Sequence, residues 1–395
     1  MNQAPAADVH HTPTARGTVW KTLGFTISHF FNDSYPSLYP ALLPVLMVDM
    51  KFSVALAGLL SSIVALTTQL LQPVMGLWAD RVGTRYFVVG GLLAGSVLTA
   101  GALAWAPSYT VFVALLLIAG LGNAAFHPHA SALVGDLTKE RKGFFMSLFM
   151  IGGNLGRAMA PIMVTTAYLW WGRQGLWVLA LPGVVVALLA YRLLTPPPKP
   201  RPRSSQLLTR GLFPAIWGAG ALLLVVALRN LASMAALTLI PIYWRHLHRP
   251  LTESALLLTV MFLTGAVGNM SGGALSDRLG AKPVMIGSAL LTSATIWWFL
   301  SSRGWTTWLA IGVLGFALYS TGSVVMVFGQ ALFPQNKGMA SGLTLGVGNT
   351  LGALAVGLIG LVASHWSIPA AFEATAVIVL ASIPFVVPLK TPERI

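Results

Sequence analysis

The chain has 395 residues, of which 56% are hydrophobic and only 9% are charged. A soluble domain carries roughly 25% charged residues, so this composition excludes an ordinary soluble protein and predicts a chain that crosses a membrane repeatedly. There is no cysteine, which excludes disulfides, thiolate catalysis and cysteine-ligated metals. The formal net charge of +14 would be compatible with nucleic-acid binding, but the placement of the basic residues, described below, argues against it.

Twelve apolar runs follow one another, each about 18–28 residues long and able to cross a hydrocarbon core of about 30 Å as a helix. They start near residues 20, 53, 86, 108, 144, 175, 212, 253, 283, 305, 338 and 370. The strands of a membrane barrel would alternate polar and apolar residues, and these runs do not. We therefore expect an all-α polytopic membrane protein with twelve transmembrane helices.

The basic residues predict the orientation of these helices. With the amino terminus inside, the outer loops hold only five of the 24 lysines and arginines, namely Lys51, Arg173, Arg245, Arg249 and Arg303. Two more lie within helices, and the others lie in inner segments. This bias predicts that both termini are cytoplasmic, and it argues against a nucleic-acid surface. Residues 1–19 lack the pattern of a signal peptide and are expected to form a cytoplasmic tail.

The first run contains SHFFND, residues 28–33, which is unusually polar for a membrane helix. Asp33 lies about twelve residues after Lys21, or about 18 Å into the membrane. His29 is one turn earlier on the same face, and Asn32 is adjacent. The other acidic residues of the chain fall in loops, tails or helix ends, so Asp33 is the one carboxylate expected at mid-depth. Tyr39, one to two turns further on, is expected to pack against neighbouring side chains, with its hydroxyl near a cavity between the helices.

Two interpretations of Asp33 stay open. A carboxylate that alternates between desolvated surroundings and a nearby cation can take up and release a proton, which makes Asp33, with His29, a candidate proton-coupling site. Alternatively, Asp33 forms a fixed ion pair with an arginine and only holds helices together.

After the second run comes GLWADRVGTR, which starts at Gly76, and a related segment, GALSDRLGAK, starts at Gly273, about half the chain length later. The repeat pairs Asp80 with Asp277, Arg81 with Arg278, Gly83 with Gly280 and Arg85 with Lys282. Glycine permits close helix approach and a tight turn, while the charged side chains can cap helices and form ion pairs at the cytoplasmic rim. A generic loop would not repeat in register.

This pattern resembles the signature loop of the major facilitator superfamily. The resemblance implies two pseudo-symmetric six-helix bundles around a cavity that opens alternately to each side, with the signature residues serving gating and structure. The expected boundaries are an N-terminal bundle at 20–194, a proline-rich basic linker at 195–211, a C-terminal bundle at 212–390 and a tail at 391–395.

Four stretches together resemble the fosmidomycin-resistance group of bacterial drug exporters: SHFFND at 28–33, LLQPVMGLWADR at 70–81, FHPHASALV at 126–134 and GGNLGRAMAPI at 152–162. Two positions depart from the group pattern. His129 stands where the group usually has an acidic residue, and Arg157 stands where it usually has a small one. Both changes add positive character, and they affect the expected substrate more than the fold.

Arg157 and Arg229 are expected near mid-depth in the fifth and seventh helices. An arginine there needs a counter-ion, and two arginines against one aspartate leave a surplus positive charge. A phosphonate, phosphate or carboxylate substrate would neutralise it in bidentate fashion. The alternative is that one arginine snorkels or caps a broken helix. The sequence leaves open which arginine pairs with Asp33.

The remaining polar candidates are weaker. His127 and His129 flank Pro128, where they form either a proton relay or hydrogen bonds to carbonyls freed by the proline. No metal site is expected, because further ligands are not apparent. The expected substrate-binding set is Arg157, Arg229, Asn32, Tyr39, Asn154, His129 and Gln330; the expected proton-coupling set is Asp33, His29 and His127.

These features predict a proton-coupled transporter that exports a small anionic or amphiphilic, fosmidomycin-like compound. It is expected to act as a monomer in the bacterial inner membrane, without a cofactor. An importer or exchanger of an organic or inorganic anion is the alternative. An enzyme or receptor is disfavoured, because the sequence has neither a catalytic cluster at a membrane face nor a sizeable soluble domain, and no Walker loop for ATP.

Overall fold

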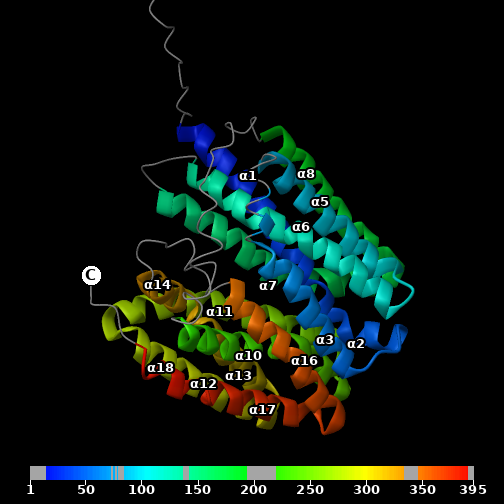
Figure 1. Ribbon diagram of the computed structural model, residues 1–395. Coiled ribbons are helices and arrows are strands. Elements are labelled where there is room, and N and C mark those ends of the chain that lie inside the picture. The colour runs from blue at the N-terminus through cyan, green and yellow to red at the C-terminus, as the bar shows by residue number, and fades with distance from the viewer. Residues whose placement is uncertain are drawn as a thin grey trace, which may run out of the picture.

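Figure 1 shows the chain as a computed structural model that describes residues 15–72, 74–75, 78, 84–136, 142–193, 219–332 and 346–389. These residues form helices joined by turns, with no strand among them. The helices gather into an N-terminal and a C-terminal bundle (Figure 1). The predicted linker lies outside the described residues, so its boundaries stay predictions.

The N-terminal bundle begins with the helix that carries the SHFFND segment. Its elements are α1 (Ala15–Ser34), η1 (Tyr35–Ser37), α2 (Tyr39–Asp49), α3 (Val54–Ala65), η2 (Leu66–Leu70), α5 (Thr84–Trp105), α6 (Tyr109–Asp136), α7 (Lys142–Gly175), η3 (Leu176–Leu179) and α8 (Ala180–Leu193). The first predicted run is therefore divided into α1, η1 and α2. Pro36 and Pro40 stand at the starts of η1 and α2, where a residue without a backbone N–H interrupts a helix at little cost.

The C-terminal bundle repeats this plan of consecutive helices. Its elements are α10 (Gly220–His246), α11 (Leu251–Leu279), α12 (Ala281–Ser301), α13 (Trp305–Tyr319), α14 (Gly322–Leu332), α16 (Asn349–His365), α17 (Ile368–Leu380) and α18 (Ile383–Val386). One predicted run is divided here too, because α13 ends and α14 begins around Ser320 and Thr321.

Nine stretches of the described residues are long and apolar enough to cross a membrane. The longest, Phe144–Arg192, is interrupted at Gly172, whose φ of 66° is not helical, so it contains two of the predicted runs. Val54–Leu70 is apolar but shorter, and the first run is divided between α1 and α2. All twelve predicted runs overlap helices, while the number of full crossings stays a prediction.

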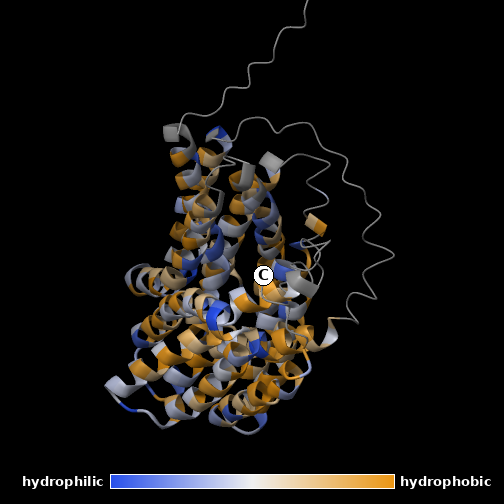
Figure 2. Ribbon diagram, turned by 90° about the vertical axis from the view of Figure 1, so that its left-hand side faces the viewer, coloured by the Kyte–Doolittle hydropathy of each residue, from blue (hydrophilic) through white to orange (hydrophobic). Residues whose placement is uncertain are grey.

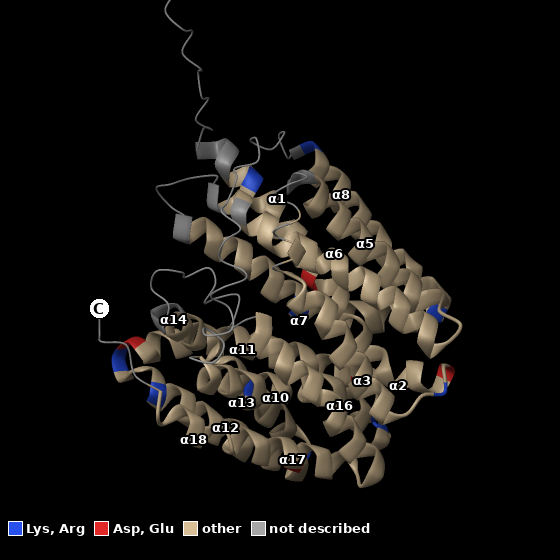
Figure 3. Cartoon of the chain, in the orientation of Figure 1, with Lys and Arg blue, Asp and Glu red and all other residues tan. Residues whose placement is uncertain are grey.

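The hydropathy and charge of the helices agree with a membrane location. Apolar residues predominate along the helices of both bundles (Figure 2). Charged residues are sparse and gather mainly at helix ends and turns (Figure 3). Large apolar side chains on the outside of the bundles are exposed, including Trp170, Leu188 and Leu358, as expected for surfaces that face lipid. The protein is thus an all-helical, multi-pass membrane protein.

The two bundles meet through the ends of their helices that lie away from the start of α1. There α3 packs against α16, α2 against α10, and α7 against α11. Figure 1 shows α2 and α3 beside α16 at this end. Ser62 Oγ donates to the carbonyl of Ala353 at 2.7 Å, and the hydroxyls of Ser61 and Thr238 lie 2.8 Å apart. These contacts close the molecule on the side opposite the start of α1.

Small residues make this contact possible. A Cβ added to Gly58 of α3 would lie 2.8 Å from the carbonyl oxygen of Val356 and 3.1 Å from Cα of Gly360 on α16. The backbones of α3 and α16 therefore touch at Gly58, in the way that small residues permit in membrane helices.

Candidate functional site

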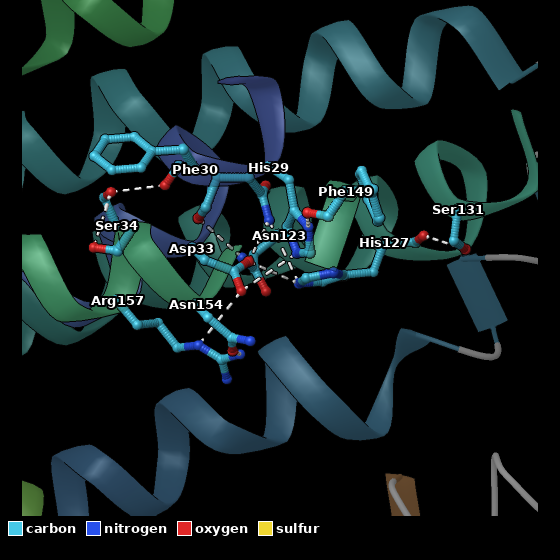
Figure 4. Close-up of polar contacts among 12 residues, drawn as sticks. His29, Phe30, Asp33, Ser34, Asn123, His127, Ser131, Phe149, Asn154 and Arg157 are labelled. Atoms are coloured by element: carbon cyan, nitrogen blue, oxygen red, sulfur yellow. Dashed lines mark hydrogen bonds and ion pairs between the residues drawn. The ribbon is translucent and has the colours of Figure 1, made fainter. Parts of the chain in front are cut away.

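Asp33 lies near the end of α1, facing α6 and α7 (Figure 4). Its side chain is only 7% exposed, and three groups surround the carboxylate. Nε2 of His29 lies 3.4 Å from Oδ2, Nε2 of His127 lies 3.2 Å from Oδ1, and Nε of Arg157 lies 3.6 Å from Oδ2. We call His29, Asn32, Asp33, His127 and Arg157 the Asp33 cluster. It brings all three residues of the predicted proton-coupling set together.

The ring of His29 has a defined orientation. Its Nδ1 lies 2.8 Å from the backbone carbonyl oxygen of Phe149 in α7, and the ring stacks on that of Phe149 with centroids 4.1 Å apart. A carbonyl oxygen only accepts hydrogen bonds, so Nδ1 must hold a hydrogen. Nε2 is then the ring nitrogen that faces Asp33. The side chain of His29 is 2% exposed, so the ring is shielded from water.

His127 approaches the carboxylate from α6 and is more accessible, with 26% of its side chain exposed. The amide of Asn32 donates to Oδ1 of Asp33 at 3.2 Å and lies 3.4 Å from Nε2 of His127. Asn123 in turn donates to the backbone carbonyl of Asn32 at 3.1 Å. Sequence analysis missed Asn123. Its position one turn before His127, on the same helical face, was the available signal.

Of the two candidate arginines, Arg157 is the one that pairs with Asp33. It projects from α7 with 39% of its side chain exposed, and its Nη2 donates to Oδ1 of Asn154 at 2.7 Å. Only its Nε faces Asp33, so part of the guanidinium edge stays available to another group. Its helix, α7, also packs against α11 of the C-terminal bundle.

The glycines of GGNLG explain how α7 comes so close to α1. A Cβ on Gly153 would lie 2.5 Å from Nε2 of His29 and 2.8 Å from Oδ2 of Asp33. Gly152 and Gly156 face the backbone of α1 at Thr26 and Phe30 in the same way. These glycines allow the close helix approach, and Gly153 lies directly against the ionisable side chains.

The cluster is suited to holding a proton. His29, Asp33 and His127 each offer a ligand atom within 4.8 Å of the others, a spacing that would also suit a metal ion. The guanidinium of Arg157 already lies beside the carboxylate, and a second cation there would be repelled. Two imidazoles, one carboxylate and one fixed cation, mostly shielded from water, are a set in which protons can be exchanged.

Arg229 lies in the other bundle and does not reach Asp33. It is 5% exposed on α10, and it contacts the break between α13 and α14. Its Nε donates to Thr321 Oγ1 at 2.7 Å and its Nη2 to Ser288 Oγ at 2.6 Å and the carbonyl of Ala317 at 3.2 Å. Carbonyls at a helix C-terminus carry partial negative charge, which favours a cation there. This is the helix-capping alternative that the sequence left open, and substrate binding by Arg229 stays a prediction.

The other predicted substrate residues lie in different surroundings. His129 is buried on α6, with Nε2 3.4 Å from the carbonyl of Met75 and its ring beside Phe87, rather than in the Asp33 cluster. Tyr39 is buried and donates to Ser61 Oγ at 3.4 Å, and with Asn32 it lines a cavity of about 10 Å³, room for one water. The side chain of Gln330 lies outside the described residues.

The second signature segment, residues 273–282, lies within the described part of the chain. Gly280, with a φ of 89°, forms the turn from α11 to α12, a conformation that favours glycine. Lys282 donates to the carbonyl of Val387 at 2.7 Å, tying the start of α12 to the end of the chain. Asp277 and Arg278 are exposed. Outside the described part of the structure lie the signature residues of the first copy, Gly76, Asp80, Arg81 and Gly83, and the side chain of Arg85.

Two helical bundles in a membrane, one of them with a buried ionisable cluster, are typical of a secondary transporter rather than an enzyme. The family model of the Major Facilitator Superfamily matches residues 23–243 and 222–395. The chain therefore belongs to the Major Facilitator Superfamily.

Two curated relatives cover almost the whole chain. The fosmidomycin resistance protein of Escherichia coli K12 is 27% identical over 94% of this chain and 93% of its own length. The uncharacterized transporter YfnC of Bacillus subtilis 168, a protein of the same superfamily type, is 29% identical over 91% of this chain and 88% of its own.

Solved structures share the fold at lower identity. The nucleoside transporter NupG gives a TM-score of 0.73 at 14% identity and covers 94% of this chain and 100% of its own. A bacterial homologue of the lysosomal transporter Spinster, in an inward-facing and unoccupied conformation, gives 0.72 at 15% identity over 95% of both chains. At this identity the likeness concerns the fold alone.

Proposed function

We propose that this transporter moves a small anionic or amphiphilic compound, of the type of fosmidomycin, out of the cell in exchange for protons. The observation that supports it is the Asp33 cluster, where one buried carboxylate faces two imidazoles and an arginine. The likeness to a fosmidomycin resistance protein supports an anionic, phosphonate-like substrate. No cofactor is needed, because the proton gradient supplies the energy.

In this proposal the substrate binds to the part of the Arg157 guanidinium that does not face Asp33. Nε faces Asp33 while Nη2 is turned towards Asn154, so an oxyanion can bind the Nη edge while Asp33 is still ionised. When Asp33 takes up a proton, it no longer holds Arg157 in place and the oxyanion site loses its orientation. Proton and substrate then exclude each other, which is the condition for exchange.

A second candidate follows from the same contact. Ionised Asp33 also competes with a substrate anion for the positive charge of Arg157, and a proton on Asp33 would then strengthen anion binding. If this Coulomb effect outweighs the orienting effect, protons and anions bind together and the protein is an importer that moves both in the same direction.

The closed side of the molecule fits either direction of transport. If both termini are cytoplasmic, as the basic residues predict, the contacts between α3 and α16 close the outer side, and Asp33 and Arg157 belong to a state accessible from the cytoplasm. We propose that the protein works as a monomer in the bacterial inner membrane, alternating between this state and an outward-open one.

The test uses the purified protein in liposomes that contain a pH dye. A pH gradient is imposed, fosmidomycin and a series of organic anions are added, and the wild type is compared with Asp33→Asn. Substrate-triggered proton flux that is lost in Asp33→Asn supports coupling at Asp33, and the direction of flux separates exchange from cotransport. Equal flux in both proteins would contradict the role of Asp33, and substrate movement without proton flux would make the protein a facilitator.

A further inference from the structure

A second pocket lies in the C-terminal bundle, at the end far from the start of α1. It has a volume of about 270 Å³ and opens where α10 and α12 end and where α11 and α13 begin. Its buried lining is aromatic: Tyr243, Trp244 and Phe299 are each less than a tenth exposed. The rings of Trp244 and Phe299 stack with centroids 6.1 Å apart. The base of the pocket is thus aromatic and closely packed, while Leu247, Leu300 and Trp308 are the lining apolar residues that stay partly exposed.

The exposed lining of the pocket is positively charged. Arg249 and Arg303 line it together with one acidic residue, Glu253. Glu253 Oε2 accepts a hydrogen bond from Nε1 of Trp244 at 2.9 Å, so it is turned towards the aromatic lining. Within the described part of the chain, neither arginine forms an ion pair. The pocket therefore has a surplus positive charge.

The backbones that present the two arginines are fixed by short turns. The N–H of Arg249 donates to the carbonyl of Trp244 at 3.1 Å. The N–H of Arg303 donates to Thr306 Oγ1 at 3.2 Å, and the same hydroxyl donates back to the carbonyl of Arg303 at 2.7 Å. A ligand that binds both guanidinium groups would order only side chains, which keeps the entropy cost of binding low.

The position of the pocket favours an amphiphilic ligand. Trp308 lines the pocket and Trp305 beside it is 70% exposed, and tryptophans of this kind mark the level of the membrane interface. Arg245, Arg249 and Arg303 are three of the five basic residues expected on the outer side, and all three lie at this end of one bundle. A concentration of positive charge on the side that is otherwise depleted of it suggests a ligand.

We propose that this pocket binds an amphiphile with a phosphate-type oxyanion. Arg249 and Arg303 would bind the oxyanion, since guanidinium groups match its geometry, and the apolar part would lie on Leu247, Leu300 and Trp308, the apolar lining residues that are not buried. The volume is slightly below the roughly 300–1,000 Å³ of pockets for drug-sized ligands, so it suits a head group or a single ring. The site is separate from the Asp33 cluster, and the proposal does not rest on the transport function.

The same chemistry could come from an anionic phospholipid or from a soluble organic phosphonate, and two assays separate these sources. In the first, the protein in phosphatidylcholine nanodiscs is exposed to phosphatidylglycerol, and retained lipid is counted by native mass spectrometry. In the second, phenylphosphonate is titrated into the protein in phosphatidylcholine nanodiscs, and the heat of binding is measured by calorimetry. The second assay uses an Arg157→Gln background, so that the proposed transport site does not contribute to the heat.

Arg249→Gln and Arg303→Gln should each weaken binding at least about tenfold in the assay that matches the true source. Arg245→Gln is the matched control, because Arg245 is exposed at the same end of the bundle but does not line the pocket. Thermal unfolding and gel filtration verify that each variant is folded. Dependence on Arg249 and Arg303 in either assay supports the site and identifies its source. If neither assay depends on them, or if Arg245→Gln has the same effect, the proposal is wrong.

Discussion

At the scale of single residues, the sequence was most informative where one helix contains both partners. Asp33 and His29 are four residues apart, so helix geometry alone places them on one face, and their side chains do meet. The choice between Arg157 and Arg229 could not be made in this way. Both have similar predicted depths, and only the rotation of α7 and α10 about their axes decides which guanidinium faces α1.

His29→Gln tests the proposed proton exchange at the imidazole. Glutamine can still donate to Asp33, but it cannot take up a proton at neutral pH. Substrate-triggered proton flux in liposomes should fall at least about tenfold, because general acid–base groups typically contribute that much or more. His365→Gln is the control, since His365 is exposed on α16. Retained proton flux with an unchanged pH profile would exclude His29 from coupling.

Gly153→Ala tests the close approach of α7 to the ionisable side chains. The added methyl group would lie 2.5 Å from Nε2 of His29, so α7 or the ring must move, and we expect a destabilisation of about 1–3 kcal/mol with loss of transport. Gly287→Ala provides a comparison, because a Cβ there meets no atom within 4 Å. Thermal unfolding in detergent measures both. Equal unfolding temperatures would show that the helices are less tightly packed than described here.

At the scale of elements, helix breaks were the least predictable feature. The prolines at 36 and 40 indicated a break in the first run, yet we expected one continuous helix there. The break between α13 and α14 has no proline at Ser320 or Thr321. Arg229 from another helix contacts this break, and a contact between segments about 90 residues apart has no signature in local sequence.

Arg229→Lys tests whether Arg229 stabilises this break. Lysine is a point donor and cannot bind Thr321, Ser288 and the α13 carbonyls together, so the loss of charged hydrogen bonds should cost about 1–3 kcal/mol. Hydrogen exchange should rise locally at residues 317–322 and the unfolding temperature should fall. Faster exchange spread over the whole C-terminal bundle, with none specific to these residues, would argue against a local capping role.

At the scale of the whole molecule, the internal repeat predicted two bundles of helices, and the family match agrees with it. The side on which the bundles meet could not be predicted, because a transporter of this family alternates between arrangements and the sequence serves both. The role of the residues at this contact between α3 and α16 can be recognised only when both partners are known. Gly58 and Gly360 are ordinary glycines in isolation, and their function becomes visible when α3 and α16 are placed together.

A disulfide between α3 and α16 should lock the molecule in the arrangement seen here. The backbone N–H of Ala55 donates to Ser364 Oγ at 2.9 Å, and the protein contains no cysteine of its own. Oxidation of the Ala55→Cys, Ser364→Cys double variant should therefore cross-link the bundles and stop transport, and a reductant should restore it. Each single variant serves as a control. Undiminished transport by the oxidised, cross-linked protein would mean that this contact does not have to open.

The shared location of Asp33 and Arg157 in one bundle has an electrical consequence. Because the two opposite charges move together, this pair transfers no net charge across the membrane field when the bundles rock. The contribution of the Asp33 cluster to the voltage dependence then comes from the ions transported, at about 2.3 kcal/mol per elementary charge per 100 mV. Export of a monoanion against one entering proton moves two positive charges inward per cycle, whereas their cotransport is electrically silent. A membrane potential imposed without a pH gradient should therefore drive the first process and leave the second unaffected.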